Sequence, residues 1–314
     1  MNGKNLNVRY RRNAYAKTRV KVIAAIFGAV AALLVISFLV VGVALKDKVD
    51  NDRVNENTNQ PQSTDTIVPH VIVPSVKGYG MTLAGATATT ASDKATEVSK
   101  AGGSNVSFVV RDTSGKELYK SALAQSMGKQ TAGNQIDITD IESKASVKGL
   151  SSSAIVPIYS FAKKDKIERA AQLFYDAAIC AESFIEGADD VLIKLEGTNV
   201  TESNLEEVLR LAEWVKDLDE KAVIGIAITK DVLSGANAEV IVGKLWEKYD
   251  FLALDLTTLK TGESISQSGS NEMQFYLLMY KMRVLLPNFT GDDLKKAVSE
   301  IESMNVDNWQ TVVQ

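Results

Sequence analysis

Short β-rich runs alternate with helix-length amphipathic segments along most of this chain, and the alternation limits its possible folds more than any other feature. A strand, a helical crossover and a further strand form the unit from which parallel sheets are built. The expected strands are 76–84, 105–112, 153–161, 189–197, 222–229 and 250–257. The expected helices lie near 91–101, 137–148, 165–186, 203–219, 235–248 and 271–285, with one more at about 291–304.

Two α/β folds use such units, an open doubly wound sheet and a closed (β/α)8 barrel of the TIM type. A dinucleotide-binding sheet needs G-x-G-x-x-G after its first strand, whereas Gly78, Gly80 and Gly85 are spaced differently. Residues 67–314 have the length of one barrel, roughly 250 residues. We therefore expect a (β/α)8 TIM-like barrel. After Pro287 the chain is short for two full units, with a last strand in NWQTVV, so closure with eight strands stays open.

An apolar run precedes the barrel, because residues 22–45 contain no charged residue and are rich in Val, Ala, Leu and Ile. A helix of that length crosses a hydrocarbon core of about 30 Å. Residues 1–21 contain seven Lys or Arg and no acid, which predicts a cytoplasmic N-terminus. A cleaved signal peptide is the alternative, although its apolar core is usually about 7–15 residues long. We expect a single-pass membrane protein whose C-terminal domain lies outside the cytoplasm.

Residues 46–66 are rich in Asn, Asp, Gln and Thr and have few aliphatic side chains. Such a segment buries too little apolar surface to order itself, which predicts a disordered stalk. The expected organisation is a basic cytoplasmic tail at 1–21, a transmembrane helix at 22–45, the stalk at 46–66 and the barrel at 67–314.

Charge and composition exclude several partners and sites. The formal net charge is −4, and without the seven basic residues of the tail residues 22–314 carry −11. So acidic a domain is a poor binder of nucleic acid. With one cysteine, Cys180, and one histidine, His70, an intramolecular disulfide cannot form, and a Cys/His zinc site or a Ser-His-Asp triad is nearly excluded. We expect neither a cofactor nor a metal.

The strand expected at 189–197 is the most informative segment for function. Its period of two directs Leu192, Lys194 and Glu196 into the barrel and the residues between them towards the helices. Barrel enzymes place their catalytic groups at the C-terminal ends of the strands. Glu196 is therefore the first candidate for a catalytic residue.

This strand resembles the signature of family 18 glycoside hydrolases, the chitinase group, whose fourth strand carries D-x-x-D-x-D-x-E with the final Glu as general acid. The four motif positions fall on Asp189, Leu192, Lys194 and Glu196, so the two inner acids are replaced. The runs AVIGIAIT and YDFLALDLT are similar to the fifth and sixth strands of that group, which usually has Met-x-Tyr where this chain has Asp-Leu-Thr. The resemblance implies an ancestry in glycosidases that act on N-acetylhexosamine-containing glycans.

A second likeness is to a bacterial family of glycosyl-hydrolase-like domains of unknown function. The run VVRDTSGKELYKS at 109–121 is similar to that family's Asp, Ser-Gly turn and Tyr-Lys-Ser. The run YDAAICAESFIEGADDVLIKL at 175–195 is similar to its helix before a strand that ends in an acid. Where that family places inward acids, this chain has Val109 and Lys194.

Lys194 changes the chemistry open to Glu196. The two residues are about 7 Å apart along one face of a strand, and an ammonium at that distance favours the ionised carboxylate. A general acid must carry a proton, so Lys194 opposes catalysis. Asp255 is the second, weaker catalytic candidate, and Lys194, Tyr159 and Arg111 are candidates for binding at the barrel mouth. Alternatively, Lys194, Glu196 and Asp255 form an ion-pair network in a barrel without activity.

Three functions remain open at this point. The leading one is a non-catalytic, membrane-anchored barrel that binds cell-envelope glycan or a protein partner. The second is a retaining glycosidase with Glu196 as general acid, and the third is a purely structural subunit of an envelope assembly.

Overall fold

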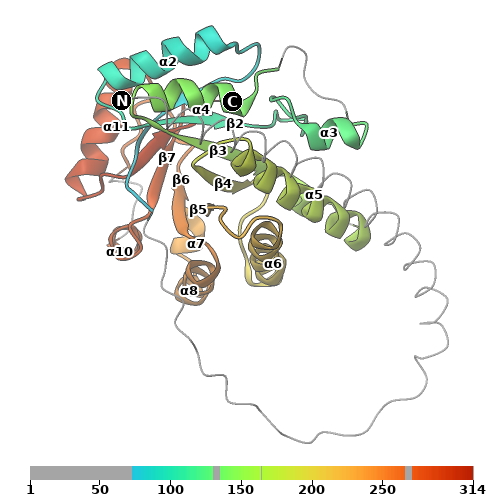
Figure 1. Ribbon diagram of the computed structural model, residues 1–314. Coiled ribbons are helices and arrows are strands. Elements are labelled where there is room, and N and C mark those ends of the chain that lie inside the picture. Colours follow the sequence, from blue (N-terminus) through green and yellow to red (C-terminus); the bar gives the residue numbers. More distant parts are fainter. Residues whose placement is uncertain (1–72, 130–134, 164, 266–270, 314) are drawn as a thin grey trace, which may run out of the picture. The chain divides into compact units, whose positions relative to one another are not determined.

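The structure, a computed structural model, describes residues 73–129, 135–163, 165–265 and 271–313 (Figure 1). The chain divides into two compact units, Met1–His70 and Val71–Gln314, and every described residue belongs to the second. The predicted tail, transmembrane helix and stalk therefore lie outside the described residues. Within the described part, no helix is both long and apolar enough to span a membrane.

Eight parallel strands close into a barrel in the order in which they follow one another along the chain (Figure 1). They are β1 Lys77–Met81, β2 Asn105–Val109, β3 Ser151–Ile158, β4 Asp190–Leu195, β5 Ile224–Thr229, β6 Phe251–Asp255, β7 Arg283–Leu286 and β8 Trp309–Thr311. Gly78 of β1 lies opposite Gln310 of β8, so the sheet has no free edge. The predicted (β/α)8 barrel is confirmed.

Two very short strands answer the question of closure. β7 has four residues and β8 has three, and β8 pairs with β7 on one side and with β1 on the other. The possibility that the barrel is incomplete at its C-terminal end, which the sequence left open, is therefore wrong. The sequence pattern of β7 and β8 was a weak signal, because such short buried strands show no clear alternation of apolar and polar residues.

The helices lie around the outside of the barrel (Figure 1). They are α2 Ala88–Lys100, α3 Ala122–Ser126, α4 Ile138–Val147, α5 Lys166–Ile185, α6 Glu202–Leu218, α7 Lys230–Leu233, α8 Ala238–Lys248, α10 Asn271–Met279 and α11 Gly291–Ser303, with a 3-10 turn at Ser160–Ala162. Thr201 caps α6, and its backbone N–H donates to Asn204 Oδ1 at 2.8 Å. The short α7, which the sequence did not predict, ends at Leu233 with Ser234 as its C-cap, and α8 begins at Ala238.

The helix predicted at 271–285 is wrong in its second half. α10 ends at Met279, and Lys281 has a φ of 47°, in the left-handed region that terminates helices. The chain then turns inward, and all four residues of β7 are buried before Pro287. A strand therefore occupies the segment where the apolar pattern suggested a continuing helix.

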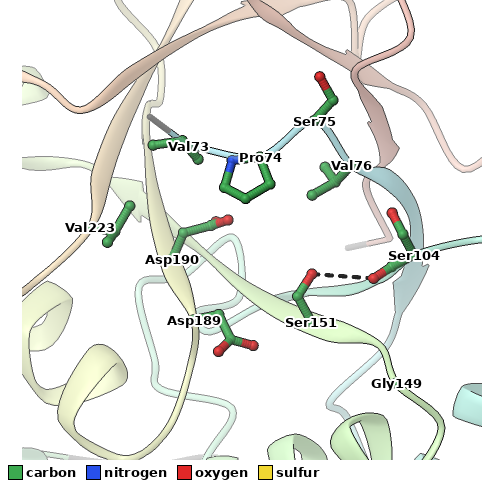
Figure 2. A pocket seen from close by; sticks show the side chains of 10 residues that line it. All are labelled: Val73, Pro74, Ser75, Val76, Ser104, Gly149, Ser151, Asp189, Asp190 and Val223. Atoms are coloured by element: carbon green, nitrogen blue, oxygen red, sulfur yellow. Dashed lines mark hydrogen bonds between the residues drawn. The ribbon is translucent and has the colours of Figure 1, made fainter. Parts of the chain in front are cut away.

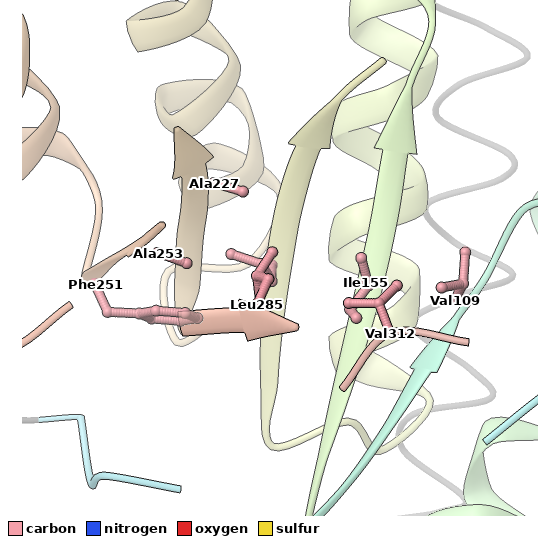
Figure 3. Packing of buried hydrophobic residues seen from close by; sticks show 8 residues of the cluster. Val109, Ile155, Ala227, Phe251, Ala253, Leu285 and Val312 are labelled. Carbon is pink, nitrogen blue, oxygen red and sulfur yellow. The ribbon is translucent and has the colours of Figure 1, made fainter. Parts of the chain in front are cut away.

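The middle of the barrel is filled by apolar side chains from different strands (Figure 3). The cluster consists of Val109, Ile155, Leu192, Ala227, Phe251, Ala253, Leu285 and Val312. The presence of Leu192 among them shows that β4 turns its predicted face inward. We call this cluster the apolar plug. Lys194 lies two residues after Leu192 on the same face of β4, so its side chain lies in the next layer, towards the C-terminal ends of the strands.

A polar layer lies below the apolar plug, at the N-terminal ends of the strands, and we call it the floor: Ser153, Asp190, Arg283 and Gln310. Arg283 is fully buried and donates to both carboxylate oxygens of Asp190, at 3.1 and 3.0 Å. The same guanidinium donates to Ser153 Oγ at 3.3 Å and to Gln310 Oε1 at 3.1 Å. Its carbon lies 4.3 Å from the centroid of the Phe251 ring.

Candidate functional site at the barrel mouth

Three of the predicted site residues meet at the C-terminal ends of β4 and β6. The ammonium of Lys194 lies 2.6 Å from Glu196 Oε1 and 3.5 Å from Asp255 Oδ2. The side chains of Lys194, Asp255 and Glu196 are 8%, 11% and 21% exposed, respectively. We call these three residues the mouth cluster. One cation therefore lies between two carboxylates, and Glu196 is the most exposed of the three.

Asp255 is held on both sides. Its Oδ1 accepts hydrogen bonds from the backbone N–H of Thr257 at 2.8 Å and from Thr257 Oγ1 at 2.6 Å, while Oδ2 faces Lys194. Glu196 follows directly after β4, and its backbone N–H donates to the Ile158 carbonyl at 2.9 Å. Both acids are thus fixed by strand ends, which are rigid supports for a site.

Tyr159 follows β3 and its hydroxyl donates to the Asp112 carbonyl oxygen at 3.0 Å. Burial raises the pKa of Tyr159 to about 12, and the negative charges of Glu196 and Asp112 add to that effect. The phenol is therefore protonated at neutral pH. Because the backbone N–H of Glu196 donates to the carbonyl of Ile158, the residue before Tyr159, Tyr159 lies beside the mouth cluster.

Arg111 belongs to a second cluster. It is 3% exposed, and its guanidinium forms ion pairs with Asp176 at 2.6 Å and with Glu117 at 3.3 Å. Burial opposes the charge, but the carboxylate of Asp176, assisted by Glu117, outweighs it and raises the pKa of Arg111. Its guanidinium also lies over the ring of Tyr175, 5.1 Å from the centroid. The guanidinium of Arg111, which was predicted to bind at the barrel mouth, therefore contacts Asp176 and Tyr175 of α5.

The acids of α5 extend this second cluster and were missed from the sequence. Glu182 accepts hydrogen bonds from Tyr119 Oη and Ser121 Oγ, both at 2.6 Å, and from the Leu123 backbone N–H at 2.9 Å. Burial raises the pKa of Glu182. The sequence signal was an acidic residue within the apolar stripe of a predicted helix. Acidic residues are rarely buried without partners, so such a position indicates a buried, hydrogen-bonded carboxylate.

Asp189, at the first position of the motif in β4, lies at the opposite end of the barrel from Glu196. Its Oδ2 accepts a hydrogen bond from the Ser152 backbone N–H at 2.8 Å. It lines a cavity of about 420 Å³ between the segment leading into β1 and the starts of β3 and β4 (Figure 2). In that cavity Ser151 Oγ donates to the Ser104 carbonyl at 3.2 Å, and Asp190 is engaged by Arg283. Asp189, Asp190 and Ser151 thus each have a polar partner within the barrel.

The described residues contain no group of three or more His, Cys, Asp or Glu side chains that could hold a metal ion. Cys180, the single cysteine, is fully buried in α5, and burial raises the pKa of its thiol.

The sequence matches no family model and no curated protein. Among solved structures, the chain is similar to a D-allulose 3-epimerase from Methylomonas sp., with 12% identity, 76% of this chain and 85% of that chain covered, and a TM-score of 0.46. It is similar to an L-ribulose 3-epimerase with 11% identity, 76% and 81% coverage and a TM-score of 0.46.

A third similar structure is Cel5A of Thermotoga maritima in complex with cellobiose, with 15% identity, 74% of this chain and 89% of that chain covered, and a TM-score of 0.42. These neighbours are proteins of sugar chemistry. At such identities and scores they carry no argument about function, and they do not single out family 18 glycoside hydrolases.

Proposed function

We propose that this chain is a membrane-anchored, extracytoplasmic protein whose glycoside-hydrolase-like barrel binds cell-envelope glycan without hydrolysing it. The observation that supports this proposal most strongly is the position of Lys194 between Glu196 and Asp255 at the barrel mouth. In the resembled chitinase group, further acids occupy that part of the fourth strand. Here an ammonium takes one of their places.

The ion pair opposes acid catalysis. A glycosidase acid must hold a proton until the glycosidic oxygen receives it, whereas a carboxylate paired with an ammonium is ionised. Glu196 Oε1 lies 2.6 Å from Lys194 Nζ, so one oxygen of this candidate acid is already engaged by an ammonium. The same pair can still recognise a sugar, since carboxylates accept hydrogen bonds from hydroxyl groups and an ammonium donates them.

A titration of the full chain in detergent with chitooligosaccharides and peptidoglycan fragments tests the binding. We expect saturable binding by the wild type and its loss in Lys194→Met. Lys216→Met is the matched control, because Lys216 also pairs with an acid, Asp250 Oδ2 at 2.7 Å, but from α6 rather than from the mouth. Equal binding by both variants, or no binding by the wild type at millimolar ligand, rules out the glycan proposal. A protein partner or a structural role would then be favoured.

A retaining glycosidase is the second candidate, and the upper limit on one distance is compatible with it. Glu196 Oε1 and Asp255 Oδ2 lie 2.6 and 3.5 Å from the same Lys194 Nζ, so they are at most 6.1 Å apart. Carboxyl groups of retaining enzymes are about 5–5.5 Å apart. If Glu196→Gln leaves every measured hydrolytic activity unchanged, the enzyme is excluded.

The membrane anchor rests on the apolar run at 22–45 and the basic residues before it. We expect the chain to stay with membranes after an alkaline carbonate wash, and the barrel to be degraded by protease added outside the cell. Release by carbonate would rule out the anchor, and protection from protease would rule out the orientation.

A further inference from the structure

The outer surface of α10 exposes large apolar side chains. Phe275, Leu278 and Met279 are 57%, 44% and 59% exposed, whereas Met273 and Leu277 are buried. Residues at spacings of three and four share one side of a helix, so the exposed three form a continuous stripe. Large exposed apolar groups that lie together mark interaction surfaces.

Aromatic rings extend this stripe. Tyr276 contacts Phe275 with ring centroids 5.6 Å apart and stacks on Tyr280 at 6.2 Å. Tyr280 in turn contacts Trp246 of α8, with centroids 5.2 Å apart. We call these six residues the α10 face: Trp246, Phe275, Tyr276, Leu278, Met279 and Tyr280. Tyr and Trp are concentrated at membrane–water interfaces, because their rings combine an apolar body with a polar group.

The α10 face lies towards the N-terminal end of the barrel. Helix α10 runs antiparallel to the strands and leads into the start of β7, so its C-terminal half lies at the end opposite the mouth cluster (Figure 1). A groove of about 370 Å³ is lined by Leu278 and Lys281 together with Ser75. The chain that leads into β1 therefore passes beside α10.

We propose that the α10 face lies in the headgroup layer of the membrane that holds residues 22–45, so that the mouth cluster faces away from the lipid. This inference rests on the membrane anchor of the proposed function. The predicted stalk and the residues up to 72 separate the predicted anchor from the described barrel, and a flexible linker of that length would span roughly 30 Å. The barrel is thus confined near lipid, where a weak contact suffices, because tethering supplies a high effective concentration.

The exposed area favours lipid over a second copy of the chain. Large side chains offer roughly 150–250 Å² when fully exposed, so three half-exposed ones present about 300 Å². A stable protein interface takes about 800 Å² from each partner. Insertion of a few side chains into a lipid surface has no such minimum when the protein is already anchored.

The test compares two labelled positions in the full chain, reconstituted in phosphatidylcholine vesicles. With Cys180→Ala as background, Leu278→Cys and Ile167→Cys each receive an environment-sensitive fluorophore. Ile167 is the matched control, since it is 64% exposed and begins α5 at the mouth end of the barrel. Spin-labelled lipid should quench the fluorophore at position 278 at least about threefold more strongly than that at 167.

Equal quenching at the two positions overturns the inference, and so does disulfide crosslinking between Leu278→Cys chains without quenching, which would indicate a second copy. A carbonate wash of the same vesicles separates this failure from that of the anchor. If the chain resists the wash but the two positions are quenched equally, the membrane anchor is supported and the docking of the α10 face is ruled out. If the wash releases the chain, both the anchor and the docking of the α10 face are ruled out.

Discussion

The two ends of the barrel interior each hold a basic residue against acids, and they differ in what surrounds them. At the floor, Arg283 is fully buried and its partners Asp190, Ser153 and Gln310 are all buried too. At the mouth, Lys194 pairs with Asp255 and with Glu196, which is 21% exposed. The ion pair at the floor is thus enclosed within the barrel, whereas Glu196 gives the mouth cluster its contact with solvent.

The difference separates structure from recognition. A buried ion pair contributes little net stability, yet removing one partner is costly because the other charge is left uncompensated. A pair beside solvent can be rehydrated, so its loss costs less and a ligand can replace it. We therefore expect the floor to serve the fold, while the proposed glycan binding rests on the mouth cluster.

The largest expected effect is at the floor. Arg283→Met leaves the Asp190 carboxylate buried without its guanidinium and should lower the free energy of unfolding by about 3–5 kcal/mol. Urea denaturation of the full chain in detergent, followed by circular dichroism, measures it. A loss below about 1 kcal/mol would remove the distinction between floor and mouth, since exposed pairs contribute that much.

A packing change sharpens the same point. Gly225 pairs with Phe251, and a Cβ at Gly225 would overlap the Phe251 ring on which Arg283 rests. Gly225→Ala should therefore destabilise the protein by about 1–3 kcal/mol through overpacking of the floor. Gly243→Ala in α8 is the control, because a Cβ there meets no atom within 4 Å. Equal effects of the two substitutions would contradict this view of the floor.

At the mouth, Lys194→Met should cost less stability than Arg283→Met, because Glu196 is 21% exposed and can be hydrated, whereas Asp190 is buried. The same urea titration compares it with Arg283→Met. A cost as large as that of Arg283→Met would mean that Lys194 serves the fold, and the binding role would lose its basis.

The smallest effect concerns Tyr159, whose pKa of about 12 in the folded protein exceeds its ordinary value of 10.0. The unfolded chain releases this proton first, so the stabilisation is complete below pH 10 and is lost as pH rises towards 12. Tyr159→Phe should flatten this part of the pH profile. Glu196→Gln should lower the pKa of Tyr159 while burial keeps it above 10.0, as fluorine NMR of fluorotyrosine-labelled protein can record. An unchanged pKa would show that Glu196 does not act on Tyr159.

Local patterns in the sequence were enough to predict most strands and the inner face of β4. Leu192 lies in the apolar plug and Lys194 in the mouth cluster because the period of two continues along that strand. The strand predicted at 105–112 is longer than β2, which ends at Val109, and Arg111 lies beyond that end. Beyond that end the alternation stops, and Arg111 pairs with Asp176 of α5.

Other features depend on contacts that a single sequence does not reveal. Arg283 and Asp190 are 93 residues apart and meet only because the barrel closes. Arg283 itself lay in a segment predicted as helix, so nothing pointed to the inside of the barrel. The floor could be found only once β7 and β8 were in place.

Proton NMR of a chitooligosaccharide incubated with the full chain in detergent tests the central claim most directly. We predict that the wild type broadens the glycan resonances, that Lys194→Met leaves them sharp, and that no new reducing-end signals appear with either protein. New reducing-end signals with the wild type that vanish in Glu196→Gln would contradict the account and establish a glycosidase.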